Sequence, residues 1–335
     1  MATTYIGIQL GSYNTLIYKQ GAGVVLKEPS LIAMSSNIKD KEVKAVGSDA
    51  HNLLTRTPKN ITVYSPISKG VIHYEELVVL MLKEFLKKVF PVKTFGQKIK
   101  AILCVPLGIT QDEKKQFEIA CYKSEITEVY IVPEVFTYAI GNKIDIKSKT
   151  SQFFVNIGAD TTSISIISNY TILSGYNISI GGSIINSGIV RFIENNYLIK
   201  ISQEQAEELK IEIGSLFENY DAKMTIVGIN TLTNNKEELV VRASDIYPVT
   251  SYYFSKIAEA IKSIIASCKP EIVSDITRFG INYYGGSIEI AGFEQFMNSK
   301  TGIKVKFIER PKHEIFGVKN LINNTERLRK ILKNN

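Results

Sequence analysis

The stretch Ile6-Gly7-Ile8-Gln9-Leu10-Gly11-Ser12-Tyr13-Asn14-Thr15 returns in altered form as Val155-Asn156-Ile157-Gly158-Ala159-Asp160-Thr161-Thr162, about 150 residues further along the chain. Each copy is an apolar, β-branched strand that runs into a glycine and then into small or hydroxyl-bearing residues. Such a turn offers backbone N–H groups and hydroxyls to phosphate oxygens. A single copy occurs by chance in many α/β proteins. The duplication therefore indicates a phosphate-binding hairpin in each half of the chain.

Further motifs follow the first hairpin in a definite order. They are Gly7–Tyr18 with Gly23–Ser30, Val46-Gly47, Arg56–Ile61, Gly70–Ile72, Cys104–Thr110, Pro133-Glu134, Gln205–Gly214 and Gly280–Ser287. In these motifs, over roughly residues 5 to 322, the chain resembles MreB, the bacterial actin family, as a divergent member. The resemblance implies an α/β fold of the actin, hexokinase and chaperone ATPase superfamily. That fold has two lobes with duplicated β-sheet subdomains and a nucleotide cleft between them.

Length and composition agree with two lobes. A chain of 335 residues exceeds one comfortable core, and 44% hydrophobic with 22% charged residues is typical of a globular protein. The most apolar stretch, Leu77 to Leu82, ends at Lys83, well short of the ~20 residues that a membrane span needs. Met1 to Thr4 lead directly into a strand, so we expect no signal peptide. Cys104, Cys121 and Cys268 are expected to be buried thiols, and the three histidines share no ligand spacing.

We expect lobe I over residues 1–141, with a small subdomain at about 32–73. Lobe II is expected over 142–322, with a small subdomain at about 182–248, and a basic tail over 323–335. The polar segment 142–151 is the expected hinge. Periodicity and capping signals predict the following elements: strands at 5–10, 14–19, 30–34, 101–105, 129–132, 152–157, 162–168 and 171–178, and helices at 75–90, 110–123, 184–195, 203–213 and 250–267.

The resemblance implies ATP or ADP with Mg²⁺ as the cofactor. The implied nucleotide contacts are Gly11, Ser12, Tyr13, Asn14 and Thr15 on one side of the phosphates, Gly158, Ala159, Asp160, Thr161 and Thr162 on the other, Glu207 and Lys210 at the ribose and base, and Gly285, Gly286 and Ser287 in the adenosine loop. Glu134 matches the glutamate that orients the attacking water, and Thr161 matches its helper.

The chain departs from the family at the metal. Gln9 and Asn156 stand where the family has aspartates, and an amide lacks the charge that favours Mg²⁺. Asp160 brings a carboxylate into the second turn. Two unit charges at about 4 Å repel by roughly 4 kcal/mol at an effective dielectric constant of 20, so Asp160 either weakens phosphate binding or turns toward the metal. The expected metal contacts, all through water, are therefore Gln9, Asn156 and Asp160.

The net charge of +7 is concentrated in part at the C-terminal end. Segment 325–333 has four basic residues against one acid, with Leu328, Ile331 and Leu332 on one side of a helix. This pattern suits either an anionic membrane surface or a solvated last helix. Phe90–Phe95, flanked by lysines, is a second candidate for membrane contact, with burial of Phe90 in a core as the alternative. No recognised nucleic-acid module accompanies the charge, so no nucleic-acid partner is expected.

Three functions remain open. The first is a cytoplasmic filament subunit, peripheral to the inner face of the cell membrane, that controls cell shape or motility and hydrolyses ATP weakly. The second is a small-molecule kinase or chaperone ATPase, disfavoured because those relatives usually carry an added substrate domain. The third is a non-hydrolysing partner that copolymerises with an active MreB paralogue.

Overall fold

The computed structural model describes residues 3–36, 42–54, 58–92, 96–306 and 314–335. The chain divides into two compact units. Unit 1 comprises Met1–Ser148, Ser168–Gly175 and Ile308–Asn335, and unit 2 comprises Lys149–Ile167 and Tyr176–Phe307. The first boundary falls near the expected hinge. The division differs from the expected one because the C-terminal residues belong to unit 1 instead of forming the end of lobe II and a separate tail.

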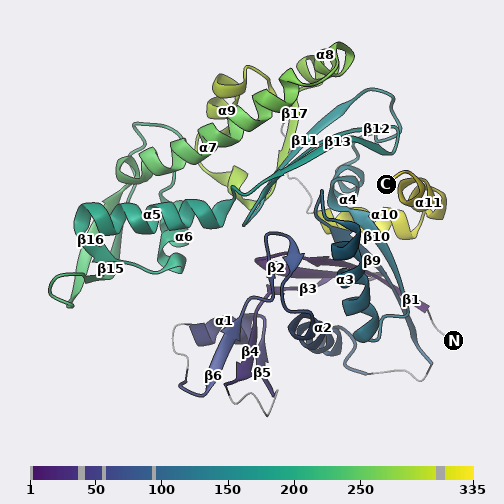
Figure 1. The fold of residues 1–335 in the computed structure, drawn as a ribbon, viewed down its shortest axis with the longest axis horizontal. Helices are drawn as coiled ribbons and strands as arrows, with labels where there is room; N and C mark the ends of the chain where they lie inside the picture. Colours follow the sequence, from purple (N-terminus) through teal and green to yellow (C-terminus); the bar gives the residue numbers. More distant parts are fainter. Residues whose placement is uncertain (1–2, 37–41, 55–57, 93–95, 307–313) are drawn as a thin grey trace. The chain divides into compact units, whose positions relative to one another are not determined.

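Unit 1 is built on a five-stranded sheet of order β10-β9-β1-β2-β3 (Figure 1). The strands are β1 (Thr3–Leu10), β2 (Asn14–Lys19), β3 (Gly23–Pro29), β9 (Lys98–Val105) and β10 (Glu128–Pro133). Strands β1, β2 and β3 form an antiparallel meander, whereas β1, β9 and β10 run parallel. The carboxyl ends of β1, β9 and β10 therefore lie at one edge of the sheet, where ligands of open α/β sheets bind.

Successive side chains of a strand point to opposite faces of the sheet, so both faces carry apolar side chains here. Helices cover both of these faces. Ile6 and Ile8 of β1 join a core with Phe85 of α2 (Glu75–Val89) and Phe117 of α3 (Gln111–Lys123). A Cβ atom on Gly7 would point the other way and lie 2.8 Å from Val318 Cγ1 of α10. The helices on that side are α4 (Glu134–Gly141) and α10 (Gly317–Ile322), and α11 (Thr325–Asn334) follows them.

A smaller part of unit 1 lies between β3 and α2. It contains β4 (Ile32–Ser35), β5 (Val43–Val46), α1 (Ser48–Leu54), β6 (Ile61–Tyr64), β7 (Ile67–Ser68) and β8 (Val71–Ile72). Strands β5, β4 and β6 form a three-stranded antiparallel sheet. This part corresponds in sequence to the small subdomain expected at about residues 32–73.

Unit 2 repeats the strand order of unit 1. Its sheet has the order β13-β12-β11-β17-β18, with β11 antiparallel to β12 and parallel to β17. The strands are β11 (Gln152–Ile157), β12 (Thr162–Ser168), β13 (Thr171–Ile178), β17 (Ile281–Tyr284) and β18 (Val305–Lys306). Residues Ser168–Gly175, which include most of the edge strand β13, are grouped with unit 1. Hairpin β11–β12 therefore takes the place in unit 2 that β1–β2 takes in unit 1, as the repeated sequence predicts.

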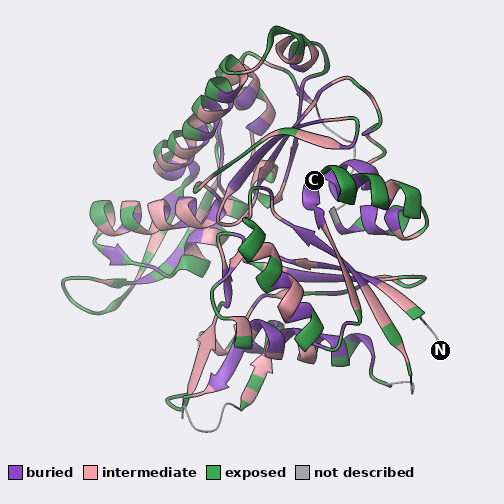
Figure 2. Ribbon diagram, turned by 45° about the vertical axis from the view of Figure 1, so that its right-hand side comes forward, coloured by how far each residue is buried: buried purple, intermediate pink, exposed green. Residues whose placement is uncertain are grey.

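The remaining elements of unit 2 surround a second core that includes Phe153, Ile189 and Phe254. They are α5 (Gly182–Tyr197), β14 (Ile199–Lys200), α6 (Gln203–Glu212), β15 (Lys223–Asn230), β16 (Lys236–Arg242), α7 (Ala243–Ala266), α8 (Pro270–Phe279), the 3-10 turn η1 (Gly286–Glu289) and α9 (Phe293–Thr301). The central strands of both sheets are buried in Figure 2. The chain therefore has two separate hydrophobic cores, as its length predicts.

Helix α11 packs its apolar side into unit 1. Leu328 and Ile331 are buried, and one side of the helix is buried while the other is exposed in Figure 2. The side chain of Asn335 donates to the carbonyl oxygen of Tyr170 at 2.9 Å and accepts from the amide of Ile172 at 3.0 Å. Most of the apolar stripe that suggested a membrane-binding tail is therefore occupied by the protein's own fold, and only Leu332 of it stays partly exposed.

Candidate nucleotide site

The two hairpins close in the same way. The amide of Gly11 donates to the carbonyl oxygen of Asn14 at 3.0 Å, and the amide of Gly158 donates to that of Thr161 at 3.0 Å. A Cβ atom on Gly11 would lie 2.8 Å from the Asn14 oxygen, so the turn requires a glycine there. The repeated sequence thus produces a repeated backbone turn, one in each unit.

Both turns present open backbone amides. Within the described residues, the amides of Ser12 in the first turn and of Ala159 and Thr161 in the second donate no hydrogen bond to the protein. Consecutive amides of this kind form a cradle that binds anions. The geometry of each turn therefore fits a phosphate group, in agreement with the sequence.

Thr15 and Thr162 brace the hairpins. Both are fully buried. The Thr15 hydroxyl lies 2.9 Å from the hydroxyl of Ser30, which in turn donates to the carbonyl oxygen of Gly11 at 2.6 Å. The Thr162 hydroxyl donates to the carbonyl oxygen of Ile180 at 2.7 Å. These two hydroxyls, expected on the phosphates, are engaged with the protein and act through the shape of the turns.

Ser12, Tyr13 and Asn14 form the tip of the first turn, in which Tyr13 is exposed and the other two are half-buried. The Ser12 hydroxyl accepts a hydrogen bond from the amide of Gly70 at 3.2 Å. The Tyr13 carbonyl oxygen accepts one from the amide of Ser30 at 2.8 Å, while its side chain is 48% exposed. Ser30 therefore holds this turn through both its hydroxyl and its amide. The sequence did not single it out as a functional residue, although it directly follows Pro29.

In unit 2 three segments with expected nucleotide residues converge at the start of α5, where none was expected. Ser287 of the adenosine loop donates to the carbonyl oxygen of Gly158 at 3.5 Å. A Cβ atom on Gly182, at the start of α5, would lie 3.0 Å from the Lys210 ammonium and 3.3 Å from the Ser287 hydroxyl. The hairpin, the N-terminus of α5, helix α6 and the adenosine loop therefore meet at one place.

Lys210 is tied to helix α5. Its ammonium group donates to Asn186 Oδ1 at 2.7 Å and to the carbonyl oxygen of Gly182 at 3.3 Å. Burial lowers the pKa of Lys210, and the charge of Glu207, one turn earlier on α6, acts in the opposite direction. This lysine therefore positions α5 beside the second hairpin in addition to the base contact that the resemblance implies for it.

The adenosine loop is tightly packed at its first glycine. Gly285 has a φ of +96°, and a Cβ atom there would lie 2.5 Å from Asn156 Oδ1. Gly286 is exposed, with no atom within 4 Å of its Cβ position. Tyr284 is buried and is paired with Asn156 across strands β17 and β11. The side-chain amide of Asn156, one of the expected metal contacts, therefore lies beside the adenosine loop.

Gln9 and Glu134 lie along the carboxyl edge of the unit 1 sheet. Gln9 is the penultimate residue of β1 and pairs with Cys104 of β9, which pairs with Val132 of β10. Glu134 follows β10, is buried, and begins α4. Gln9 Oε1 is buried and, among the described residues, lacks a hydrogen-bond donor. An acceptor of this kind suits a metal-bound water, so the position fits Mg²⁺ held through its water shell.

The described residues contain no cluster of ionisable side chains of the kind that holds a resident metal ion. No group of three or more His, Cys, Asp or Glu side chains among them is arranged to hold an ion. Asp160, expected near the metal, accepts a hydrogen bond from the Ser183 hydroxyl at 2.9 Å. The residues thus fit Mg²⁺ that arrives with a nucleotide better than they fit a resident metal.

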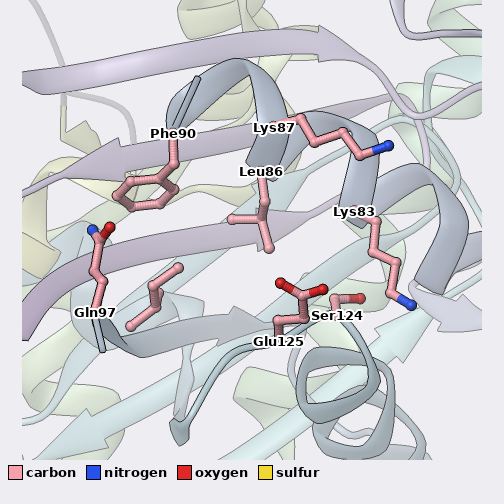
Figure 3. Close-up of a pocket in the computed structure, with 8 residues that line it drawn as sticks. Lys83, Leu86, Lys87, Phe90, Gln97, Ser124 and Glu125 are labelled. Carbon is pink, nitrogen blue, oxygen red and sulfur yellow. The ribbon is translucent and has the colours of Figure 1, made fainter. Parts of the chain in front are cut away.

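A pocket of about 130 Å³ lies elsewhere in unit 1 (Figure 3). Its lining residues are Lys83, Leu86, Lys87, Phe90, Gln97, Ile99, Ser124 and Glu125. None of the expected nucleotide residues is among them. Phe90 is 7% exposed and borders this pocket, whereas Val92 is 80% exposed; Phe95 lies outside the described residues.

A family model described as MreB/Mbl protein matches residues 3–330. The chain belongs to the MreB/Mbl family. It is 30% identical over 314 residues to the cell shape-determining protein MreB of Escherichia coli strain K12, covering 93% of this chain and 90% of that protein. The family assignment confirms the resemblance drawn from the motifs.

Solved structures confirm the actin-like fold. MreB 5 of Spiroplasma citri bound to AMPPNP superposes with a TM-score of 0.89 at 26% identity, covering 98% of both chains. The subunit of the MamK double helical filament superposes with a TM-score of 0.81 at 15% identity, covering 96% of this chain and 99% of that one. At that identity the second likeness concerns the fold alone.

Proposed function

We propose that this MreB-family chain binds ADP or ATP through its two glycine hairpins and assembles into filaments that control cell shape or motility. The observation that carries this proposal is the pair of turns, each closed by the same 3.0 Å hydrogen bond and each with open amides. The bound AMPPNP of the Spiroplasma citri relative supports the same ligand class.

The amides of Ser12, Ala159 and Thr161 bind phosphate oxygens in this proposal. Glu207, Lys210 and the loop from Gly285 to Ser287 hold the ribose and base. Magnesium, when bound, neutralises phosphate charge. Calorimetric titration with ADP and with AMPPNP, with and without Mg²⁺, tests the binding. Absence of heat with every ligand would overturn it.

We further propose that hydrolysis is slow. Glu134 and Thr161 can orient a water, but Gln9 and Asn156 supply no negative charge to favour Mg²⁺. The expected result is phosphate release well below that of a relative with both aspartates, restored in part by Gln9→Asp with Asn156→Asp. Rapid, Mg²⁺-dependent release that Glu134→Ala abolishes would contradict slow hydrolysis.

Filament formation is proposed to be head to tail, because heterologous contacts that do not close give open filaments. Pelleting and electron microscopy of the purified full chain test it. Polymers that form from this chain alone support the subunit function. Co-assembly only with an intact MreB paralogue would instead favour the regulatory partner, which the altered metal positions also suit.

Membrane contact is proposed at the exposed residues Pro91 and Val92, on the inner face of the cell membrane. None of the described helices is long and apolar enough to cross a bilayer. The basic side of α11, with Arg329 and Lys333 exposed, adds attraction to anionic lipid. Val92→Asp is expected to reduce co-sedimentation with anionic vesicles. Val25→Asp, at a valine that is 40% exposed on β3, is the control, and equal loss would contradict the assignment.

A further inference from the structure

A carboxylate lies within the second phosphate turn and is held by the start of helix α5. Asp160 Oδ1 accepts a hydrogen bond from the Ser183 hydroxyl at 2.9 Å. The amide of Ser183 also donates to the carbonyl oxygen of Ala159 at 2.7 Å. Ser183 therefore grips the turn by its backbone and holds the carboxylate by its side chain.

The Asp160 carboxylate and a bound phosphate would both be attracted to the same positively polarised region. The turn amides of Ala159 and Thr161 and the N-terminal end of α5, where Gly182 donates to the Gly158 carbonyl oxygen at 2.9 Å, all attract anions. A fixed negative charge beside this region repels a ligand in proportion to the ligand's own charge. A triphosphate carries one more negative charge than a diphosphate.

We propose that Asp160 is a specificity-determining residue that makes this site favour ADP over ATP, with Ser183 limiting the repulsion. The inference rests on the proposed nucleotide binding. The Ser183 hydroxyl compensates part of the carboxylate charge and keeps it against the helix N-terminus, which is the favourable end of the helix dipole for an anion. Loss of Asp160's charge therefore weakens the discrimination, and loss of the Ser183 hydroxyl strengthens it.

The test is calorimetric titration of the full chain with ADP and with AMPPNP, without Mg²⁺ and then with it. Asp160→Asn is expected to tighten AMPPNP binding relative to ADP on the order of tenfold. Ser183→Ala is expected to shift the ratio of the two dissociation constants in the opposite direction. The variant with both changes should behave as Asp160→Asn alone.

Ser187→Ala is the matched control, because Ser187 lies one turn further along α5 and donates to the Ser183 carbonyl oxygen at 3.0 Å. The ratio of its dissociation constants for AMPPNP and ADP should equal that of the unaltered chain. An unchanged ratio in Asp160→Asn and Ser183→Ala, with both nucleotides still binding, overturns the proposal and leaves the proposed function intact. Failure of the unaltered chain to bind either nucleotide overturns the proposed function and this inference together.

Discussion

A Cβ atom on Gly317 would overlap the carbonyl oxygen of Thr137, so α10 and α4 meet backbone to backbone. Gly141 completes the contact, because a Cβ atom there would lie 3.0 Å from the amide nitrogen of Gly317. The Thr137 hydroxyl donates to the carbonyl oxygen of Glu134 at 2.9 Å. The position of the candidate water-orienting glutamate therefore depends on a glycine 183 residues further along the chain.

Gly317→Ala is expected to destabilise the chain by about 1–3 kcal/mol, because overpacking a buried contact forces backbone shifts. Urea unfolding measures the change. Lys319→Ala, at an exposed position of the same helix, should stay within about 0.5 kcal/mol of the unaltered chain. Equal midpoints for both variants would show that the two helices can separate without cost.

Gly285→Ala is expected to abolish or strongly weaken ADP binding. The substitution strains a residue at φ +96° and pushes a methyl group against Asn156 Oδ1. Gly286→Ala has open space around its Cβ atom and should bind ADP as the unaltered chain does. Calorimetry compares the two. Equal loss in both variants would mean that the loop acts through flexibility and not through this contact.

Local signals predicted much of the fold. The Thr110 side chain accepts from the amide of Glu113 at 3.2 Å in a capping box, as that sequence pattern predicts. The repeated hairpins were visible because their strands and turns lie within a dozen residues. Helix α7 was predicted from residue 250 but begins at Ala243 and contains Pro248. The amide of Arg242 donates to Asp245 Oδ2 at 2.8 Å, and this cap starts the helix before the proline.

What the sequence did not predict depends on distant partners. Ser30 engages Thr15 across 15 residues, and Asn335 engages Tyr170 across 165. Such contacts leave no periodic signal in either segment. Gly158, Lys210 and Ser287 of unit 2 lie close together, whereas the hydroxyls of Thr15 in unit 1 and Thr162 in unit 2 bond to the protein. Whether a hydroxyl faces a ligand or its own backbone depends on where the next strand lies.

Ile331→Ala is expected to cost about 2–4 kcal/mol, because the side chain is fully buried against unit 1. Leu332→Ala, at a neighbouring residue that is 37% exposed, should cost less than about 1 kcal/mol. Urea unfolding again separates them. Equal and small losses of unfolding free energy would mean that α11 does not pack on the rest of unit 1 in solution. Its apolar side would then again be a candidate for membrane binding.

Stability is expected to fall at alkaline pH because of Cys121, which is fully buried in the unit 1 core. Burial raises the pKa of its thiol from 9.0 to about 12, and the charge of Glu118 adds to the shift. Between these two values the unfolded chain has released the proton while the folded chain retains it. The free energy of unfolding therefore decreases as pH rises from 9 toward 12, by at most roughly 4 kcal/mol.

Cys121→Ala removes this dependence while adding a constant cavity cost at every pH. Urea unfolding in reducing buffer at pH 7, 8.5 and 10 should give a shallower decline for Cys121→Ala than for the unaltered chain. Cys268→Ala is the control, because that thiol is only partly buried and its pKa is raised less. Parallel declines in all three proteins would place the alkaline loss elsewhere, because other groups that titrate above pH 9 would then account for it.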